Sequence, residues 1–344
     1  MTKTIEYSEV EKNDVENKYV LIDVRSPKEF LNSTIPGAVN VPLFTDEQRE
    51  LIGTVYVRES IEKAKKIGIE AASKNLPYIY DKINELTKNY KNLVFFCARG
   101  GMRSSSLVAL IEALSIRAFK LNNGYKGYRS YINEKLPCTV SGIKFVVIHG
   151  NTGVGKTSIL KTLEEEGHEV LDLEKYANHR GSLLGSIGLG EQNSQKQFES
   201  LVYDKLKNRK SNIVFVEGES RKIGRIIIPD CIFNLMKSGE HIKLTADIEL
   251  RIKNILADYI QKDDVELLEA VNKLRKYISE KNIDKYIDNI NNKNYQYVIR
   301  ELMVKYYDPM YENNKYDFRL TLEHKEIYET CNIIVDWVEA NLKF

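Results

Sequence analysis

The sequence predicts an α/β fold class, with two α/β domains in series and a helical C-terminal extension. Three observations carry this prediction. Short apolar runs alternate with amphipathic stretches as far as residue 137, the alternation starts again at residue 143, and from about residue 247 apolar side chains recur every three or four positions. Alternating strands and helices favour mostly parallel sheets, and the later spacing favours helices. The predicted domains are 1–137, 138–246 and 247–344, with the last packed on the second.

Continuous apolar runs mark the strands of the first predicted domain. The runs YVLIDV at 19–24 and NLVFFC at 92–97 are short and bounded by polar residues, as buried parallel strands are. The stretch AFKLNNG at 118–124 predicts a third strand that ends in a turn. Helical patterns lie between and after these strands, at 46–52, 58–73, 78–90 and 105–114.

The second predicted domain begins after a short linker, for which Pro137 and the small polar residues up to Gly142 are suited. Apolar runs predict its strands at 143–150, 169–173, 212–218 and 240–246, with helices between them. This second βαβ series again predicts a parallel sheet. From Asp247 onwards, charged residues interleaved with Ile, Leu and Tyr predict helices.

The composition excludes several classes of protein. Of the 344 residues, 42% are apolar and 29% charged, which excludes general disorder, a fibre and a membrane bundle. The apolar runs are far shorter than the ~18 residues that cross a bilayer, and the N-terminus lacks a signal pattern. A net charge of +2 gives no general attraction to nucleic acid. The four cysteines form neither a CxxC pair nor a zinc spacing, so we expect a protein of the reducing cytoplasm. Because the apolar runs are short, we expect no membrane partner.

A cysteine and two arginines frame the first candidate site. Cys97 ends an apolar strand, and Arg99 and Arg103 follow it before a helix. Backbone N–H groups and cations at a helix N-terminus stabilise a thiolate, and paired glycines let amides converge on a tetrahedral anion. The pattern predicts a nucleophilic cysteine beside an anion site; the alternative is an inert, buried cysteine. The expected anion-binding residues are Arg99, Gly100, Gly101, Arg103 and Ser104.

The second candidate site matches the P-loop pattern G-x-x-x-x-G-K-[ST]. It follows the strand FVVIH and precedes a helix, as a phosphate-binding loop requires. Its amides would hold a di- or triphosphate, Lys156 would neutralise the outer phosphate, and Thr157 could reach a Mg²⁺. The alternative is a glycine-rich turn without a ligand. The predicted phosphate-binding residues are Gly150, Asn151, Thr152, Gly153, Val154, Gly155, Lys156 and Thr157.

Polar residues at two further strand ends are candidate supporting residues. Glu217 ends the strand IVFVE, where P-loop proteins often carry an acid that organises the metal, and Asp172 leaves another strand end beside Glu174. Surface salt bridges or helix caps would explain these residues equally well. His149, directly before the P-loop, is expected to pack within its strand. The candidate supporting residues are Asp172, His179, Arg180, Glu217, Glu219, Ser220 and Arg221.

The N-terminal region resembles the rhodanese family. The stretches Asp23–Phe30 (DVRSPKEF) and Ile35–Leu43 (IPGAVNVPL) are similar to its signatures, and Cys97 falls where rhodaneses keep the cysteine that forms a persulfide. The resemblance implies a rhodanese-like α/β domain. The Cys-x5-Arg spacing is the longer loop of rhodanese-fold phosphatases, and this length suits a phosphate-sized group better than a bare sulfane sulfur.

Together, the two loops and several further motifs resemble the tRNA 2-selenouridine synthase family, from about Tyr19 to Tyr311. In three places, Val57, Asn123 and Gly218, the chain departs from the residues usual in that family. The shared motifs are Ile52–Tyr56, Gly124–Arg129, Asp172–Glu174, His179–Ser182, Glu219–Gly224 and Tyr307–Tyr311.

This resemblance implies a transferase that acts on tRNA with a thiolated wobble uridine. The thiocarbonyl sulfur would take a geranyl group from geranyl diphosphate, and selenium from selenophosphate would then displace the geranylthio group to give 2-selenouridine. The order is chemically reasonable, because an S-alkyl sulfur leaves far more easily than sulfide. We assign the diphosphate to Gly150–Thr157 and selenophosphate to Cys97–Arg103. Cys97 would carry selenium as a perselenide or attack the donor directly.

Three other functions stay open from the residues alone. A rhodanese-type sulfurtransferase fused to an ATP-using P-loop kinase ranks first among them. A cysteine phosphatase would need a general acid that the sequence does not locate. A non-catalytic scaffold conflicts with the intact Cys97.

An RNA-binding face has candidate residues in the C-terminal region. Lysines and tyrosines occur together at Lys273–Tyr277 and Lys285–Tyr286, and such residues suit phosphate contacts and stacking on bases. Acids interspersed among them favour a different interpretation, a solvated helical bundle with tyrosines in its core.

Overall fold

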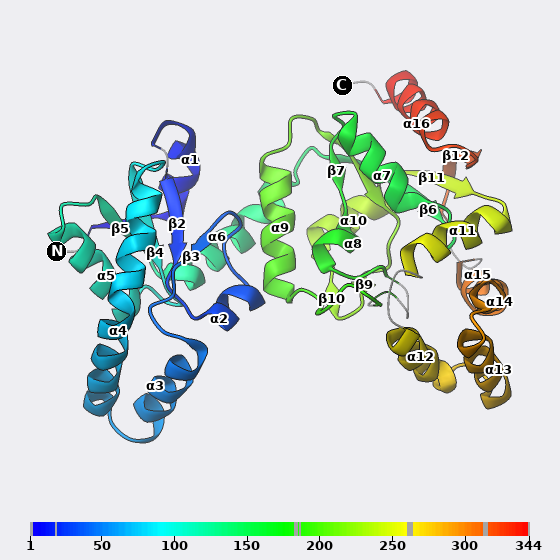
Figure 1. The fold of residues 1–344 in the computed structure, drawn as a ribbon. Coiled ribbons are helices and arrows are strands. Elements are labelled where there is room, and N and C mark those ends of the chain that lie inside the picture. Colours follow the sequence, from blue (N-terminus) through cyan, green and yellow to red (C-terminus); the bar gives the residue numbers. More distant parts are fainter. Residues whose placement is uncertain are drawn as a thin grey trace. The chain divides into compact units, whose positions relative to one another are not determined.

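The structure is a computed structural model, and it describes residues 3–17, 19–181, 185, 187–259, 264–311 and 316–342. The chain forms two compact units. The first consists of Met1–Cys138 with Glu199–Asp204, and the second of Thr139–Phe198 with Lys205–Phe344. Each unit contains its own five-stranded parallel sheet with helices around it (Figure 1), so the predicted α/β fold class is confirmed.

The sheet of the first unit has the strand order β1-β5-β4-β2-β3, and all its pairings are parallel. Every residue of the central strand β4 is buried, as expected where helices cover both faces of a parallel sheet. Because Cys97 is the residue after β4, it lies at the carboxyl edge of this sheet. The strands are β1 Thr4–Ile5, β2 Tyr19–Asp23, β3 Val39–Asn40, β4 Asn92–Phe96 and β5 Ala118–Leu121.

One predicted break in the helices of this unit is wrong. The stretches 58–73 and 78–90 belong largely to one helix, α4, which contains the exposed Pro77. Ala71 before this proline and Ile79 and Ile83 after it are all buried in one apolar core, and this packing outweighs the ~3 kcal/mol cost of the proline. The helices of the unit are α1 Tyr7–Asn17, α2 Pro27–Asn32, α3 Asp46–Arg58, α4 Ile61–Thr87, α5 Met102–Ala113 and α6 Gly124–Thr139.

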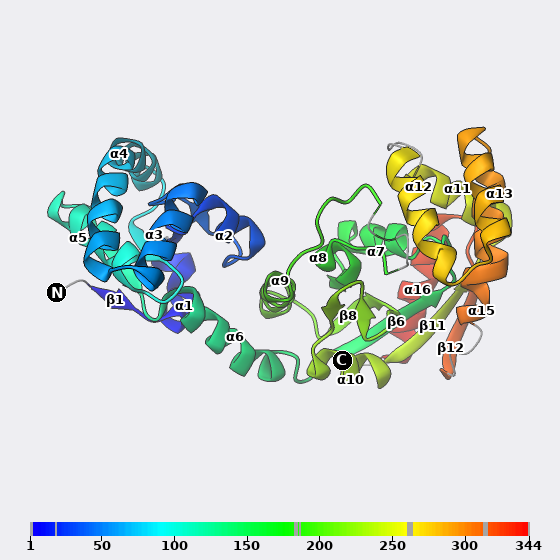
Figure 2. The same ribbon diagram turned by 90° about the horizontal axis from the view of Figure 1, so that it is seen from below.

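The sheet of the second unit has the order β12-β11-β6-β8-β7, again with parallel pairings. Figure 2 shows α7 (Lys156–Glu165) and α16 (Ile327–Asn341) on one side of this sheet and α10 (Asp230–Lys237) on the other. Apolar side chains of α7 and α16 form one core with the sheet. The strands are β6 Lys144–Gly150, β7 Val170–Leu171, β8 Ile213–Glu217, β11 Glu240–Thr245 and β12 Phe318–Glu323.

Strand β12 adds one strand to the region after Asp247, which the sequence predicts to be mostly helical. Its residues alternate between partly buried and exposed, and it pairs only with β11, at the edge of the sheet. An edge strand with one exposed face has polar residues at every second position, here Arg319, Thr321 and Glu323, and its apolar signal is correspondingly weak. The C-terminal region therefore completes the sheet as well as covering it.

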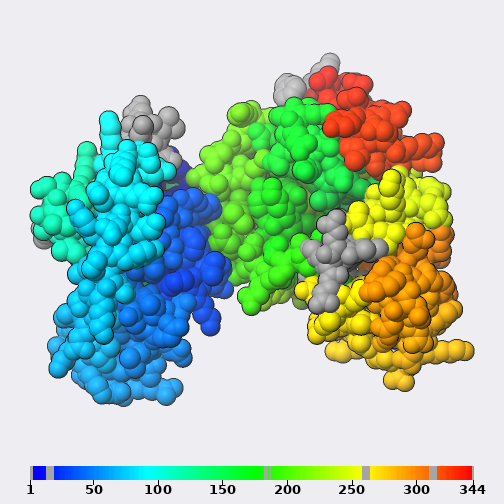
Figure 3. Space-filling view, viewed as in Figure 1, coloured from blue at the N-terminus to red at the C-terminus, as the bar shows by residue number. Residues whose placement is uncertain are grey.

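The C-terminal helices between Asp264 and Tyr307 share a core of their own, and Figure 3 shows their outer surface in yellow to orange. Ile283, Tyr286, Ile290, Val298 and Leu302 are buried in this core. No helix in the described part of the chain is long and apolar enough to cross a membrane. The helices are α11 Ile248–Tyr259, α12 Asp264–Lys273, α13 Glu280–Asn291, α14 Tyr295–Leu302, a π-helical turn Met303–Tyr307 and α15 Asp308–Tyr311.

Candidate active site

The Cys97 loop connects the end of β4 to the start of α5, as the sequence predicts. Cys97 is buried, and its Sγ lies 3.3 Å from Oγ of Ser104. Burial disfavours the thiolate, but hydrogen bonds from the Ser104 hydroxyl and from the amides of Ser104 and Arg99, together with the charge of Arg103, outweigh it and lower the pKa of Cys97. The loop therefore favours a reactive thiolate over an inert cysteine.

Glycine is required at the point where α6 touches this loop. Gly124 has φ +54°, and a Cβ on it would lie 2.2 Å from the carbonyl oxygen of Cys97. The next two amides, of Tyr125 and Lys126, donate to the carbonyl oxygens of Cys97 and Ala98 at 2.9 and 3.0 Å. With its carbonyls held in this way, the loop leaves its own amides for a ligand.

Asn123 precedes this contact and also has a positive φ, +52°. The family's usual second glycine at this position is thus replaced by a residue that adopts the left-handed region more readily than most. The departure leaves the turn intact.

The arginines of the loop have different environments. Arg103 donates from Nη1 and Nη2 to the two carboxylate oxygens of Glu29, at 2.7 and 3.4 Å, whereas Arg99 is exposed. Glu29 was not among the predicted site residues, although it belongs to the rhodanese-like signature. Its separation of 74 positions from Arg103 hides the pair from local sequence patterns. Glu29 fixes the orientation in which Arg103 faces the loop.

Two other signature residues are structural. Asp23 and Arg25 form a buried, bidentate ion pair, with Arg25 Nη2 2.6 Å from Asp23 Oδ2. Thr34 donates to the same carboxylate at 2.9 Å, and the Arg25 guanidinium lies 4.4 Å from the ring centroid of Tyr125. A buried pair with these added contacts orders the chain around the sheet edge rather than binding an anion.

The lowered pKa of Cys97 predicts a pH dependence of its alkylation. A lower pKa means that the thiolate persists to lower pH, so Ser104→Ala should move the midpoint of the rate profile upward. We would measure iodoacetamide labelling of the Cys97 peptide by mass spectrometry across the pH range. Ser106→Ala is the matched control, because Ser106 is exposed on the same helix and donates only to the carbonyl of Arg103. An unchanged midpoint in Ser104→Ala would contradict the role of this hydrogen bond.

The second loop has the backbone of a phosphate-binding loop. Gly153 and Gly155 have φ +80° and +96°, and a Cβ on Gly153 would lie 2.7 Å from the carbonyl oxygen of Arg251. Lys156 begins α7, and its Nζ donates to the carbonyl oxygen of Gly150 at 2.8 Å. The loop residues Asn151, Thr152, Val154 and Thr157 complete the turn between β6 and α7. The loop amides, the N-terminus of α7 and Lys156 together suit a di- or triphosphate.

A clamp from the C-terminal helices holds this loop from outside. Arg251 on α11 donates from Nε to the carbonyl oxygen of Thr152 at 3.0 Å and forms a bidentate pair with Asp308. Asp308 also accepts the side-chain amide of Asn151 at 3.0 Å. We call Asn151, Arg251 and Asp308 the P-loop clamp. The clamp binds the carbonyl oxygen of Thr152 on the outside of the loop. This contact helps keep the loop amides directed toward the phosphate site.

Most of this clamp carries no signal in the local sequence. Asp308 lies in a family-like motif without an assigned role, and Arg251 carried no signal. Asn254, one turn of α11 further on, adds a bond from its side-chain amide to the carbonyl oxygen of Gly153 at 2.9 Å. Arg251 and Asn254 thus bind the carbonyls of two successive loop residues. Their spacing of three residues, which places both on one face of a helix, can be read from the sequence.

Asp308→Asn should destabilise the second unit, because it leaves the nearly buried Arg251 without its carboxylate. Removing one partner of such a pair costs about 3–5 kcal/mol of unfolding free energy. Urea unfolding monitored by circular dichroism would measure it. Asp284→Asn is the matched control, since its pair with Arg275 is exposed and its loss should change little. Equal stability of the two variants would show that the clamp does not stabilise the loop.

Four acids gather where β7 and β8 end. Glu217, which is buried, accepts the backbone N–H of Glu174 at 2.7 Å. Burial and the neighbouring carboxyl groups raise the pKa of Glu217 well above its usual range and that of Glu174 to about 8; burial also raises the pKa of Glu219. Asp172 caps α8 (Leu173–Ala177) through the amide of Lys175. Acids with raised pKa values beside a ligand loop are candidates for proton transfer.

The other supporting residues form local contacts. Arg180 donates to the carbonyl oxygen of Ile187, and His179 has a buried Nδ1 without a hydrogen-bond partner among the described residues. Ser220 and Arg221 are exposed; the first bonds the carbonyl of Lys222, and the second pairs with Asp230. Both serve the turn around β9 (Lys222–Ile223) and β10 (Ile226–Ile227). Ser182 of the family-like motif lies outside the described residues.

His149 packs within β6, as predicted. It is buried, and its Nε2 lies 2.8 Å from Nδ1 of His241. Burial, His241 and Lys156 lower the pKa of His149 to about 3, so the ring is neutral. A Cβ on Gly218 would lie 2.4 Å from this ring. The departure at Gly218 is therefore a packing requirement.

The P-loop pattern predicts that Thr157 could reach a Mg²⁺. In the described part of the chain, no three His, Cys, Asp or Glu side chains are grouped to hold a metal ion. Thr157, the second residue of α7, is exposed at the loop and is the protein oxygen that suits a magnesium ion brought with a diphosphate.

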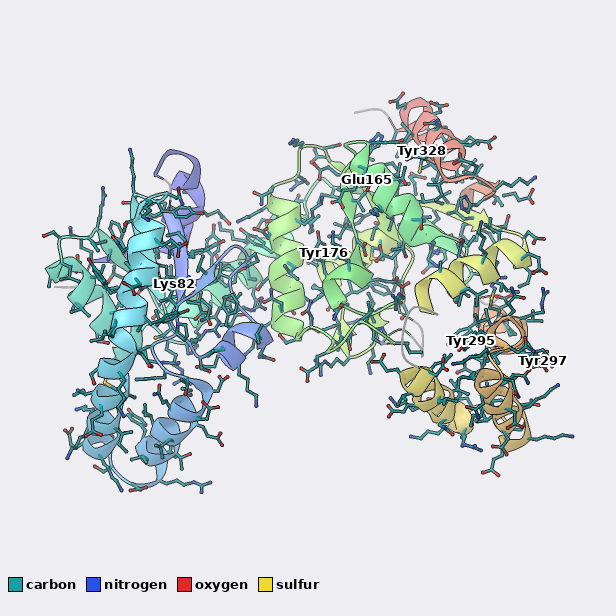
Figure 4. All side chains as sticks on the ribbon, viewed as in Figure 1. Lys82, Glu165, Tyr176, Tyr295, Tyr297 and Tyr328 are labelled. Atoms are coloured by element: carbon teal, nitrogen blue, oxygen red, sulfur yellow. The ribbon has the colours of Figure 1, made fainter. Side chains whose placement is uncertain are left out.

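The two candidate RNA-binding tyrosines lie in different environments. Tyr286 is buried in the core of the C-terminal helices, as the bundle interpretation predicts, and Tyr277 is 63% exposed. Lys285 Nζ lies 4.8 Å from the ring centroid of Tyr297 on α14, labelled in Figure 4 beside Tyr295. Of the predicted pairs, only Tyr277 remains able to stack on a base.

Comparison with known proteins reveals relatives of both units. The family model described as tRNA 2-selenouridine synthase AAA domain matches residues 143–290, and the rhodanese-like domain model matches residues 6–131. The tRNA 2-selenouridine synthase of Marinobacter nauticus is 28% identical over 358 aligned positions, covering 94% of this chain and 95% of that protein. The chain belongs to the tRNA 2-selenouridine synthase family.

Another tRNA 2-selenouridine synthase, from Nitrosomonas europaea, is 35% identical over 250 positions. The match spans 70% of this chain and 63% of that relative's length. Among solved structures, the N-terminal domain of a Clostridium difficile 630 protein described as ATP/GTP-binding is 35% identical, with a TM-score of 0.36, and covers 38% of this chain and 98% of its own.

Proposed function

We propose that this member of the family is itself a tRNA 2-selenouridine synthase, a transferase that converts the wobble 2-thiouridine of cytoplasmic tRNA to 2-selenouridine. One observation carries the proposal: a single chain holds a thiolate-favouring Cys-x5-Arg loop and a P-loop, each built for an anion. The reaction uses two anionic donors, geranyl diphosphate and selenophosphate, and the two loops match them in number and charge.

In the first step the P-loop binds geranyl diphosphate. The thiocarbonyl sulfur attacks C1 of the geranyl group, the C1–O bond breaks, and negative charge grows on the diphosphate. Lys156 and the amides around Gly153 and Gly155 stabilise that charge. Thr157 would hold a magnesium ion, which would supply further positive charge.

In the second step selenium bonds C2 of the base, geranylthiolate leaves, and the phosphoryl group of selenophosphate is lost to water. We assign selenophosphate to the Cys97 loop, where Gly100, Gly101 and Ser104 supply backbone amides and Arg103 a cation. Cys97 attacks the phosphorus of this donor: the S–P bond forms as the P–Se bond breaks, the released selenide attacks C2, and water hydrolyses the S-phosphocysteine.

A reconstituted reaction tests this function. The full chain is incubated with thiolated tRNA, geranyl diphosphate and selenophosphate, and the nucleosides are analysed by mass spectrometry over time. We expect S-geranyl-2-thiouridine to appear first and 2-selenouridine to follow. Turnover of ATP without RNA, with neither nucleoside formed, would favour a sulfurtransferase fused to a kinase and overturn the proposal.

A further inference from the structure

Acidic side chains from two strand ends meet beside the P-loop. Glu174 lies on α8, which follows β7, and Glu219 follows β8 by two residues. Their carboxyl groups are hydrogen-bonded to each other, and both interact electrostatically with Lys156. A Cβ on Gly181 would lie 2.6 Å from Glu219 Oε2 and 3.0 Å from Glu174 Oε1, so both carboxyl groups reach one point. We call Glu174 and Glu219 the carboxyl pair.

A third acid lies against the carboxyl pair with one oxygen unsatisfied. Glu217 is 2% exposed; its Oε1 accepts the N–H of Glu174, but its Oε2 has no hydrogen-bond partner among the described residues. Glu217 interacts with both members of the pair, so its side chain belongs to the same cluster. An unpartnered buried oxygen is costly, and such oxygens occur where a site handles a ligand or a proton.

The proposed geranyl transfer requires a proton acceptor. 2-Thiouridine carries a proton on N3, whereas its neutral S-alkyl derivative has an N3=C2 double bond and no such proton. A sulfur lone pair forms the S–C1 bond, and the electron pair of the broken C1–O bond stays on the diphosphate. The electron pair of the N3–H bond then becomes the N3=C2 π bond, and the proton passes to a base. Nothing is oxidised or reduced.

We propose that the carboxyl pair is the base that takes the N3 proton of the thiolated uridine. The inference rests on the proposed function and adds a catalytic group to it. Lys156 binds the diphosphate whose C1 is attacked, so the sulfur must come close to this lysine. N3 is only two bonds from the sulfur, and Glu174 and Glu219 both interact with Lys156. A base near this lysine would therefore be within reach of the N3 proton.

The charge state of the carboxyl pair suits this role. Two adjacent carboxyl groups share one proton, because both cannot ionise easily, and the remaining negative charge can accept a second proton. The groups that act on the pair are Lys156 on α7, Asp172 before α8 and Glu217 on β8. With the pKa of Glu174 raised to about 8, the pair matches the weakly acidic N3 proton near neutral pH.

Glu219→Gln tests the proposal, since it keeps the shape of the side chain and removes its charge. Formation of S-geranyl-2-thiouridine from thiolated tRNA is followed by mass spectrometry across the pH range. At neutral pH the rate should fall by about 10²-fold, and it should recover partly as pH rises, because N3 then ionises unaided. Glu174→Gln should act in the same direction. Glu339→Gln, exposed on α16, is the matched control and should keep the wild-type profile.

Binding of inorganic diphosphate, measured by calorimetry on the same variants, separates the possible outcomes. It should be unchanged or tighter in Glu219→Gln, because one negative charge beside the P-loop is removed. Wild-type geranylation rates at every pH in both variants would overturn the proposal. So would loss of diphosphate binding together with the rate, which would indicate a structural role. If the wild-type protein forms no S-geranyl product at all, the proposed function fails instead.

Discussion

Cys97→Ser should abolish selenium incorporation while leaving the geranylation of tRNA largely intact. Only the second step of the proposed reaction needs a soft nucleophile beside an oxyanion site, and the hydrogen bond to Ser104 and the charge of Arg103 prepare a thiolate for it. A serine hydroxyl at this position would remain protonated and unreactive. Mass spectrometry of the nucleosides should therefore show S-geranyl-2-thiouridine accumulating without 2-selenouridine.

The matched control for this experiment is Cys138→Ser. Cys138 lies exposed in the last turn of α6, and its replacement should leave both products unchanged. If Cys97→Ser folds normally but loses both steps equally, the assignment of geranyl transfer to the P-loop and of selenation to the Cys97 loop is wrong. Circular dichroism of the variant would establish that it folds.

Lys156→Ala should show the opposite pattern, with geranyl transfer slowed by ~10²–10³-fold. The lysine is placed to stabilise the charge that develops on the departing diphosphate, and loss of one such charged contact is worth about 3–4 kcal/mol of barrier. Selenation releases no diphosphate, so tRNA that is already geranylated should bypass the defect. The measurement is a pair of assays on one variant, with thiolated and with geranylated tRNA.

Lys161→Ala is the matched control for Lys156→Ala. It lies on the same helix, with its side chain 75% exposed, and is expected to behave as wild type in both assays. A folded Lys156→Ala variant that fails on both substrates would mean that the P-loop binds something other than the geranyl donor. Normal activity on both would mean that the loop no longer takes part in the reaction.

Much of both candidate sites could be predicted because the decisive residues are close in sequence. The Cys97 loop and the P-loop are each a strand, a short turn and a helix, and their glycines and cations lie within eight positions. Apolar runs likewise predicted the principal strands of both sheets, since burial on both faces requires continuous apolar residues. The local sequence was therefore enough to predict the anion-binding groups of each loop.

The groups that orient these loops could not be predicted in the same way. Glu29 meets Arg103, and Asp308 meets Asn151, only after the chain has folded, because each pair is separated by many elements. Strand β12 escaped detection because an edge strand needs few apolar residues. Gly218 departs from the residue usual in the family, and the reason appears only in the fold, where it makes room for the ring of His149.

The P-loop clamp also constrains how this family can diverge. Asp308 accepts hydrogen bonds from Arg251 and Asn151 together, so replacing Asp308 leaves two donors and one charge unmatched, and replacing Arg251 leaves the carboxylate without its cation. Single substitutions would be removed by selection, whereas coordinated changes would survive. Among homologous chains we therefore expect positions 151, 251 and 308 to covary. An alignment of homologues should then reveal the clamp, although no local motif contains it.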